Sequence, residues 1–233
     1  VLEDAVAQGV LARNVVKLVD RIPRQRKEMD TFSEEEVRLL LKSVFETDME
    51  HVWHLALYGL RRGELAGLRW EDIDDEVGVL GIRRARVAVD GLAQLSLPKT
   101  VNSGRTLPIS SDLRAVLARA RVRQAQDAEM AGDAYEASGF VAVDKLGRAL
   151  HPETLSARWD EALARAGVRR IRLHDARHTC GTLLHLQGVP VALISAWLGH
   201  ADAAFTMKVY VHSQPDVLND VRRYFERDTD EDV

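Results

Sequence analysis

Residues 79–109 interrupt a sequence whose apolar residues otherwise recur at helical spacing. Within this stretch, three short apolar runs favour β-strands: Val79–Ile82, Arg86–Val89 and Thr106–Ile109. Leu92–Leu97 alternates in polarity and follows Asp90 and Gly91, a dipeptide that favours a two-residue hairpin turn. We therefore predict an α+β fold, mainly α-helical, with a small three-stranded antiparallel sheet in which 92–97 is the middle strand.

Helix-start and helix-end signals divide the rest of the chain. Ser33 and Glu36 form a capping-box pattern ahead of an apolar stripe. Gly167, Gly188 and Gly199 stand where helices are expected to end. The predicted helices cover residues 2–12, a segment after 33, 49–58, a segment from about 61, 111–130, 152–166, 174–187, 190–198, 202–209 and 214–225.

The composition narrows the classes of protein to which the chain can belong. A single cysteine, Cys180, excludes an internal disulfide and fits a reducing compartment. No apolar run is long enough to cross a membrane, and no secretory signal opens the chain. We therefore expect a cytoplasmic protein.

Charge is distributed unevenly along the chain. The net charge is −4, and residues 226–233 alone carry −4, so the remainder is balanced. We expect this acidic segment to be a disordered tail and the charged segment 20–30 to be a linker. Residues 158–177 hold six arginines and three acids, a local positive excess with the sign that binding to phosphate requires.

Two arginines follow a glycine at the start of a predicted helix, within residues 59–64. Arg61 and Arg62 stand beside main-chain amides that a helix start leaves unpaired, and these groups together favour an anion. The alternative is a solvated arginine pair with Glu64 as a surface partner.

Residues 174–178 place three polar side chains on one helix face. His174, Arg177 and His178 share that face because residues three and four apart are neighbours, and His174 and Arg177 could contact one phosphate. The two histidines also have the spacing of some metal sites, but the glutamate of the common zinc motif is missing and Arg177 lies between them. We therefore expect no metal, and the alternative for His178 is a core position.

A third polar group lies near the C-terminus of the sequence. His200 follows Leu198 and Gly199, and Tyr210 lies ten residues further on. The alternatives are a histidine that caps a helix end and a partly buried tyrosine. The pair suits a phosphate under attack by a phenol when combined with the polar residues upstream: Arg61, Lys99, His174 and Arg177.

These residues resemble the catalytic domain of the tyrosine recombinases, or phage integrases. That family carries an arginine in a Gly-Leu-Arg-x-Gly-Glu box, a lysine in a β-hairpin, a His-x-x-Arg box, a Leu-Gly-His box and a tyrosine beyond it. The matches lie in the family's order over about residues 33–225: Arg61, Lys99, His174, Arg177, His200 and Tyr210. Ala176 departs from the leucine that is usual there, which a packed helix face tolerates.

The resemblance implies a site-specific DNA recombinase that cuts and rejoins DNA without metal, ATP or another cofactor. Tyr210 would be the nucleophile and would form a 3′-phosphotyrosine. The other implied roles are phosphate binding by Arg61, Arg177 and His200, acceptance of the phenolic proton by His174, and protonation of the leaving 5′-oxygen by Lys99.

The resemblance also implies partners and domain boundaries. The expected partners are double-stranded DNA attachment sites and a homo-tetramer that forms through helix 214–225 and acts through a Holliday junction, with a DNA-bending host factor and an excisionase as accessory proteins. Residues 1–30 would be the end of a core-DNA-binding domain and its linker, 31–225 the catalytic domain and 226–233 the tail.

Three other functions remain open at the level of sequence. A type IB topoisomerase would use the same catalytic roles but relax DNA as a monomer. A DNA-binding regulator on an inactive recombinase fold is disfavoured by the presence of the tyrosine and both arginines. A metallohydrolase would use His174 and His178 as ligands.

Overall fold

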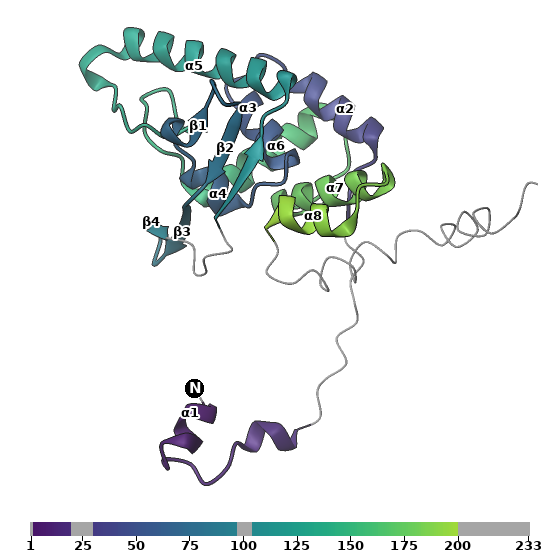
Figure 1. Cartoon of the computed structure of the whole chain (residues 1–233). Coiled ribbons are helices and arrows are strands. Elements are labelled where there is room, and N and C mark those ends of the chain that lie inside the picture. The colour runs from purple at the N-terminus through teal and green to yellow at the C-terminus, as the bar shows by residue number, and fades with distance from the viewer. Residues whose placement is uncertain (1, 20–29, 97–103, 200–233) are drawn as a thin grey trace, which may run out of the picture.

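A computed structural model describes residues 2–19, 30–96 and 104–199 (Figure 1). The α-helices are α1 (Leu2–Ala7), α2 (Glu34–Ser43), α3 (Glu50–Leu57), α4 (Arg62–Gly67), α5 (Ser111–Ala131), α6 (Pro152–Ala166), α7 (Leu173–Leu186) and α8 (Val191–Leu198). Short 3-10 helices are η1 (Val15–Leu18), η2 (Trp70–Asp72) and η4 (Gly132–Ala134). The strands are β1 (Ile73–Asp74), β2 (Val79–Ile82), β3 (Ala85–Val89), β4 (Leu92–Ser96) and β5 (Arg105–Pro108).

The local signals place most of the helices correctly. At the start of α2, the Glu36 amide donates to Ser33 Oγ over 3.2 Å and the Ser33 amide donates to Glu36 Oε2 over 2.8 Å, so the predicted capping box is confirmed. As predicted, Gly167 directly follows the end of α6 and Gly199 that of α8, and both glycines have a left-handed backbone. The predicted helix 2–12 is shorter in the structure, where α1 ends at Ala7.

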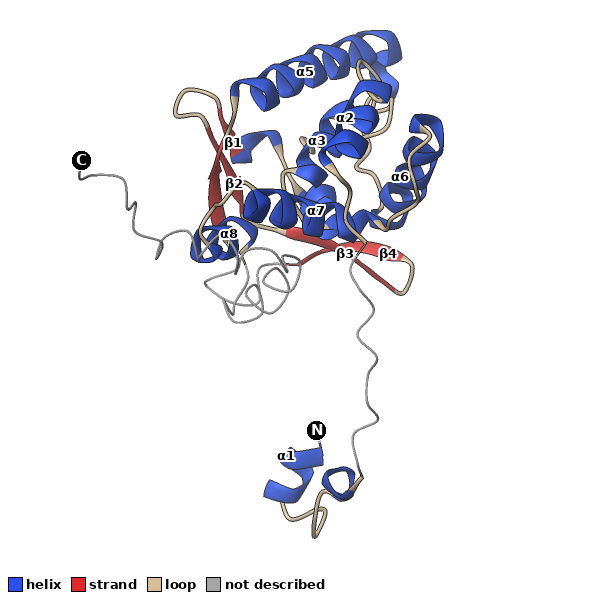
Figure 2. Ribbon diagram, turned by 90° about the vertical axis from the view of Figure 1, so that its right-hand side faces the viewer, coloured by secondary structure: helices blue, strands red, loops and turns tan. Residues whose placement is uncertain are grey.

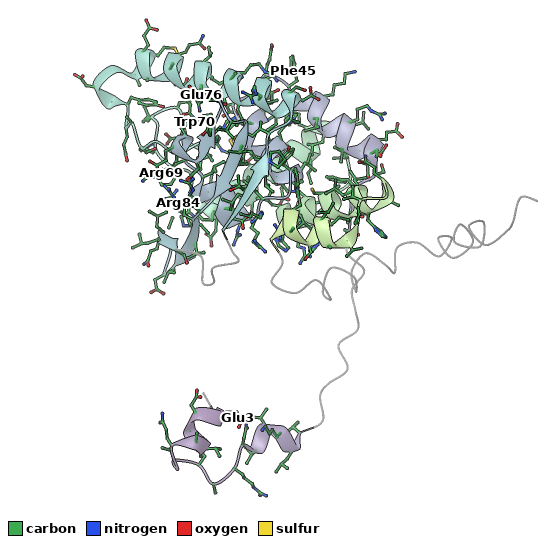
Figure 3. All side chains as sticks on the ribbon, viewed as in Figure 1. Glu3, Phe45, Arg69, Trp70, Glu76 and Arg84 are labelled. Carbon is green, nitrogen blue, oxygen red and sulfur yellow. The ribbon has the colours of Figure 1, made fainter. Side chains whose placement is uncertain are left out.

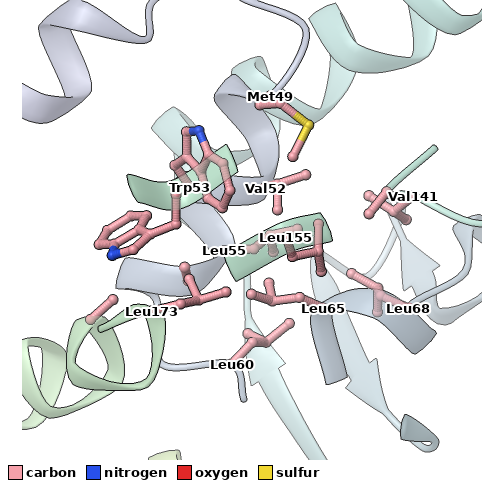
Figure 4. Packing of buried hydrophobic residues seen from close by; sticks show 14 of the residues in the cluster. Met49, Val52, Trp53, Leu55, Leu60, Leu65, Leu68, Val141, Leu155 and Leu173 are labelled. Carbon is pink, nitrogen blue, oxygen red and sulfur yellow. The ribbon is translucent and has the colours of Figure 1, made fainter. Parts of the chain in front are cut away.

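The core lies between the helices of the 30–199 region. Trp159 of α6 meets Trp53 of α3 with ring centroids 5.3 Å apart, and the Phe32 ring centroid lies 6.3 Å from that of Trp159. Leu55 of α3 and Leu155 of α6 pack in the same cluster (Figure 4). Burial of these large side chains supplies the main favourable contribution to folding. It also fixes α3, whose C-terminal end leads directly to the candidate site.

The sheet contains three antiparallel strands, but its membership differs from the prediction. β2 is the middle strand, with β1 on one side and β5 on the other, and Leu80 lies opposite Leu107. The predicted middle strand at 92–97 appears as β4, which pairs with β3 in a separate two-stranded hairpin (Figure 2). The predicted turn at Asp90 and Gly91 is confirmed, with positive φ at both residues.

A bend between β2 and β3 explains the difference. Arg84, labelled in Figure 3, lies at this bend and donates to Glu71 Oε1 over 2.6 Å and to Asp72 Oδ1 over 3.1 Å. β5 therefore pairs with β2 before the bend, and β4 pairs with β3 after it. Alternation along a single strand specifies which side chains share a face, but not which neighbour the strand will pair with.

The hairpin packs closely against α4. A Cβ added at Gly63 would lie 2.9 Å from the carbonyl oxygen of Arg86, so only glycine permits this approach. The Arg86 guanidinium in turn donates to the Leu150 carbonyl over 3.0 Å. These contacts hold the strand region beside the N-terminal end of α4.

Residues 2–19 contribute no buried side chain from α1 or η1. The assignment of 1–30 to a preceding DNA-binding domain and linker stays a prediction, as does that of 226–233 to a disordered tail, which lies outside the described residues.

Over the ranges 2–19, 30–96 and 104–199, none of the helices combines the length and apolar character needed to span a bilayer.

Candidate active site

The candidate site lies where the end of α8 meets the corner between α3 and α4. Gly59 forms this corner with φ +101°, and a Cβ there would lie 2.8 Å from Leu198 Cδ2. Glycine is therefore required both for the backbone conformation and for the approach of α8. The Trp197 indole donates to the Tyr58 carbonyl over 2.9 Å and joins the same two segments.

The last carbonyls of α8 each accept a hydrogen bond from a different arginine. Arg105 Nε donates to the Trp197 carbonyl over 2.8 Å, and Arg177 Nη2 donates to the Leu198 carbonyl. Arg61 Nη2 donates to the Gly199 carbonyl over 2.8 Å. Carbonyls at a helix C-terminus lack helical partners and carry partial negative charge, so cations are favoured there. Three arginines from distant parts of the chain thus converge immediately before His200.

Arg177 donates hydrogen bonds both to the α3–α4 corner and to the end of α8. It lies on α7 and is buried, with a residue exposure of 1%. Its Nη1 donates to the Gly59 carbonyl over 2.7 Å, in addition to the bond to Leu198. A buried guanidinium needs polar partners of this kind because an uncompensated buried charge is strongly destabilising.

Arg61 is more accessible than Arg177. Its side chain keeps 36% of its surface exposed while Nη1 donates to Glu64 Oε1 over 2.6 Å. The Arg61 amide donates to the other carboxylate oxygen of Glu64 over 2.8 Å. The guanidinium is therefore oriented by the protein and still reachable from solvent. Arg62, by contrast, is exposed and donates to Ser156 Oγ over 3.2 Å, away from this cluster.

Glu64 is an internal residue, which contradicts the alternative in which it is a surface partner. It is 6% exposed and accepts hydrogen bonds from Arg105 over 3.0 and 2.9 Å as well as from Arg61. Burial acts to raise the pKa of the Glu64 carboxyl, but these hydrogen bonds and charges outweigh it and lower the pKa to about 2. Glu64 is thus an ionised carboxylate between two arginines.

His174 and His178 lie together on α7, as the helical spacing predicted. Their rings meet edge to face with centroids 5.0 Å apart. Burial, followed by the charge of Arg177, lowers the pKa of His174, so its imidazole is neutral near pH 7 and can accept a proton. His178 is buried, and its burial together with His174 lowers its pKa to about 4. The core position weighed for His178 is therefore the one that it occupies.

The other reactive groups considered from the sequence have different surroundings. Cys180 is buried, and burial raises the pKa of its thiol to about 12. Over the described residues, no group of three or more His, Cys, Asp or Glu side chains is arranged to hold a metal ion.

Three of the predicted site residues lie outside the described residues: Lys99, His200 and Tyr210. The same holds for the predicted helices 202–209 and 214–225. Of the remaining predicted residues, the structure brings Arg61 and Arg177 to adjacent carbonyls at the end of α8, with His174 on the same helix as Arg177.

Arg105 and the buried state of Glu64 were not predicted as parts of the site. Arg105 stands six residues after Lys99, and Glu64 stands three residues after Arg61 in its box. From the sequence alone, Arg105 could be assigned to the hairpin and Glu64 to a helix surface. Only the tertiary contacts show that they form one ion pair.

Comparison with known proteins identifies the family. The model of the phage integrase family matches residues 31–216, and the chain belongs to this family. The chain is 33% identical over 230 residues to the tyrosine recombinase XerC-like protein of Caldanaerobacter subterraneus, covering 91% of this chain and 59% of that protein. It is 28% identical over 218 residues to the ICEBs1 integrase of Bacillus subtilis, covering 92% and 59%. The chain therefore spans about three-fifths of the length of these relatives.

Solved structures show the same fold. The Tn1549 transposon integrase in complex with transposon right end DNA superposes with a TM-score of 0.74 at 16% identity, covering 92% of this chain and 71% of that one. A lambda integrase dimer bound to a core site gives 0.55 at 17% identity, covering 89% and 55%. The predicted family and fold class are confirmed, and the relatives named above are a tyrosine recombinase-like protein and an integrase.

Proposed function

We propose that the protein is a site-specific DNA recombinase that cuts and rejoins DNA through a 3′-phosphotyrosine, with Tyr210 as the nucleophile. The observation that carries the proposal is the convergence of Arg61 and Arg177 on the carbonyls directly before His200. Main-chain carbonyls and non-bridging phosphate oxygens are both hydrogen-bond acceptors with negative charge. Arginine donors that are arranged around main-chain carbonyls are therefore also suited to binding phosphate oxygens.

In the cleavage step, the Tyr210 oxygen attacks the scissile phosphorus and the bond to the 5′-oxygen breaks. Negative charge builds on the non-bridging oxygens, which Arg61, Arg177 and His200 would stabilise. Preorganised donors of this kind contribute about 3–4 kcal/mol each. Energy of the broken linkage is kept in the phosphotyrosine, so rejoining needs no ATP and the step draws on no cofactor.

Proton transfer completes the step. A phenol ordinarily has a pKa near 10 and is a poor nucleophile at neutral pH. His174, whose pKa is lowered, would accept or relay the phenolic proton. Lys99 would give a proton to the leaving 5′-oxygen. Attack by a 5′-hydroxyl from another duplex then reverses the same transfers and joins the exchanged strand.

The assembly belongs to the proposal as well. The partner is double-stranded DNA at attachment sites, and the relatives solved on DNA support this choice. Four copies would hold two duplexes through a Holliday junction, with segment 214–225 docking onto a neighbouring copy. A DNA-bending host factor and an excisionase would assist, and the site of action would be the bacterial cytoplasm.

Covalent capture tests the proposal. The protein is incubated with random-sequence duplexes that carry a nick, so that the cleaved fragment with its 5′-hydroxyl diffuses away and the adduct is trapped. The wild type should form an adduct that survives denaturation and maps to Tyr210, and captured sequences then serve as defined substrates. Tyr210→Phe should form none, whereas Tyr135→Phe, which changes a tyrosine outside the candidate site, should behave as the wild type.

Two results would contradict the proposal. An adduct that persists in Tyr210→Phe would show that another residue is the nucleophile, and strong inhibition by EDTA would indicate a metal mechanism. Relaxation of supercoiled DNA by a monomer without site preference would instead favour the type IB topoisomerase.

A further inference from the structure

Arg105 is the first residue of β5 and one of the most connected side chains of the candidate site. Its side chain is only 6% exposed. It donates through Nε to the Trp197 carbonyl over 2.8 Å, through Nη1 and Nη2 to Glu64 over 3.0 and 2.9 Å, and through Nη2 to the Gly59 carbonyl over 3.4 Å. One guanidinium thus joins β5, α4, the α3–α4 corner and the end of α8.

The contact with Glu64 connects Arg105 to the predicted catalytic arginine. Oε1 of Glu64 accepts from both Arg105 Nη1 and Arg61 Nη1. Loss of the Arg105 bonds would leave the carboxylate free to turn toward Arg61. The direction in which the Arg61 guanidinium points therefore depends on Arg105.

The contact with α8 connects Arg105 to the segment that follows. A Cβ at Gly199 would lie 2.9 Å from Arg105 Cδ, so the arginine stem packs against the residue directly before His200. Gly199 has φ +63°, and its carbonyl accepts from Arg61. Arg105 and Arg61 therefore hold the same turn from two sides.

We propose that Arg105 is a positioning residue for strand cleavage, which sets the Arg61 guanidinium through Glu64 and sets the Gly199 turn through Trp197. This rests on the proposed function. The side chain of Arg105 is 6% exposed against 36% for Arg61, so Arg105 would act on the phosphate through Arg61. Lysine cannot replace it, because a single ammonium group cannot reproduce the planar, multi-donor geometry.

The test uses the full chain and a captured duplex as substrate, with the single-turnover rate of adduct formation measured at saturating protein. Arg105→Lys should slow the reaction by about 10²-fold, since a misplacement of about 1 Å in a reacting group has effects of this size. DNA binding should change little. Arg84→Lys is the matched control, because Arg84 also pairs with two carboxylates, and it should react at the wild-type rate.

A second substrate separates positioning from a general loss of structure. A methylphosphonate at the scissile position removes one negative charge that Arg61 would neutralise. The deficit of Arg105→Lys relative to wild type should therefore shrink several-fold on this substrate. A folding defect would lower both rates equally, and that result, or a wild-type rate for Arg105→Lys on the normal substrate, would overturn the inference.

Glu64→Asp provides the same signature by a different change, should Arg105→Lys fail to fold. This variant retains the negative charge but has a side chain shorter by one methylene group, so its carboxylate cannot reach both arginines in the same way. Its cleavage rate should therefore fall on the normal phosphate substrate, and the deficit should shrink on the methylphosphonate substrate. An equal loss on both substrates would reject the positioning role. If the wild type forms no adduct with any duplex, the proposed function and this inference are both rejected, whereas failure confined to the variants rejects only the inference.

Discussion

Two groups of arginines in this protein differ in what their guanidinium groups contact. Arg61, Arg105 and Arg177 donate to main-chain carbonyls at the end of α8. Three arginines of segment 158–172, namely Arg158, Arg169 and Arg170, instead pair with carboxylates at exposed or half-buried positions, as Arg170 does with Asp160 over 2.6 Å.

The difference shows that a local excess of positive charge does not locate a phosphate site. Within segment 158–172, the side chain of Arg170 is 79% exposed and that of its partner Asp160 is 37% exposed. Exposed ion pairs of this kind are screened by water and salt, and each contributes little. Arg61, Arg105 and Arg177 are preorganised instead, because tertiary contacts orient each guanidinium.

The largest expected effect separates two adjacent arginines. Arg61→Ala should lower the single-turnover rate of adduct formation by about 10²–10³-fold, because one preorganised donor to the developing charge is lost. Arg62→Ala removes the neighbouring exposed guanidinium, which contacts Ser156, and should change the rate by less than about threefold, in line with the small value of exposed contacts. Equal losses in the two variants would show that the distinction between oriented and solvated arginines has no bearing on cleavage.

A smaller effect should appear in stability and its dependence on pH. The pKa of Glu64 is about 2, below its ordinary value of 4.5, so its contribution is complete above about pH 4.5 and is lost as the pH falls toward 2. A pKa shift of this size corresponds to about 3 kcal/mol in the free energy of unfolding. Glu64→Gln should therefore lower the free energy of unfolding by about 3–5 kcal/mol at pH 7, since Arg105 loses its buried counter-charge.

Urea unfolding at pH 7 and pH 3 checks this expectation. The difference between wild type and Glu64→Gln should narrow at the lower pH, because the wild-type carboxylate begins to lose its contribution there. Glu71→Gln is the control, since the Glu71 side chain is 60% exposed although it also pairs with Arg84. It should cost less than about 1 kcal/mol, and a cost equal to that of Glu64→Gln would remove burial as the explanation.

The smallest effect is expected in the surface group. Arg170→Ala removes the ion pair with Asp160 and should change the free energy of unfolding by no more than about 0.5 kcal/mol. The rate of adduct formation should stay at the wild-type value. Thermal unfolding and the capture assay together measure both. A loss of cleavage without a loss of stability would place Arg170 among the residues that contact DNA.

Much of the helical structure was predictable because its signals are local. The capping box at Ser33, the left-handed glycines after α6 and α8, and the turn at Asp90 and Gly91 each depend on residues a few positions apart. The arrangement of His174 and Arg177 on one helix follows from the same short-range geometry.

The pairing of β4 was not predictable in the same way. Its alternation is compatible with either neighbour, and the choice depends on the bend at Arg84 and on contacts with Glu71 and Asp72. Such contacts join segments whose separation in sequence carries no periodic signal.

The order and types of the boxed residues were enough to determine the family and to nominate candidate site residues, of which the structure brings Arg61 and Arg177 to the end of α8. Only the tertiary structure decided that Glu64 is buried and that Arg105 joins it to Arg61 and the end of α8. The physical reason is that helix caps and turns are satisfied by near neighbours. A buried guanidinium, in contrast, is satisfied by whichever acceptors the folded chain brings to it, and here these come from positions 59, 64 and 197.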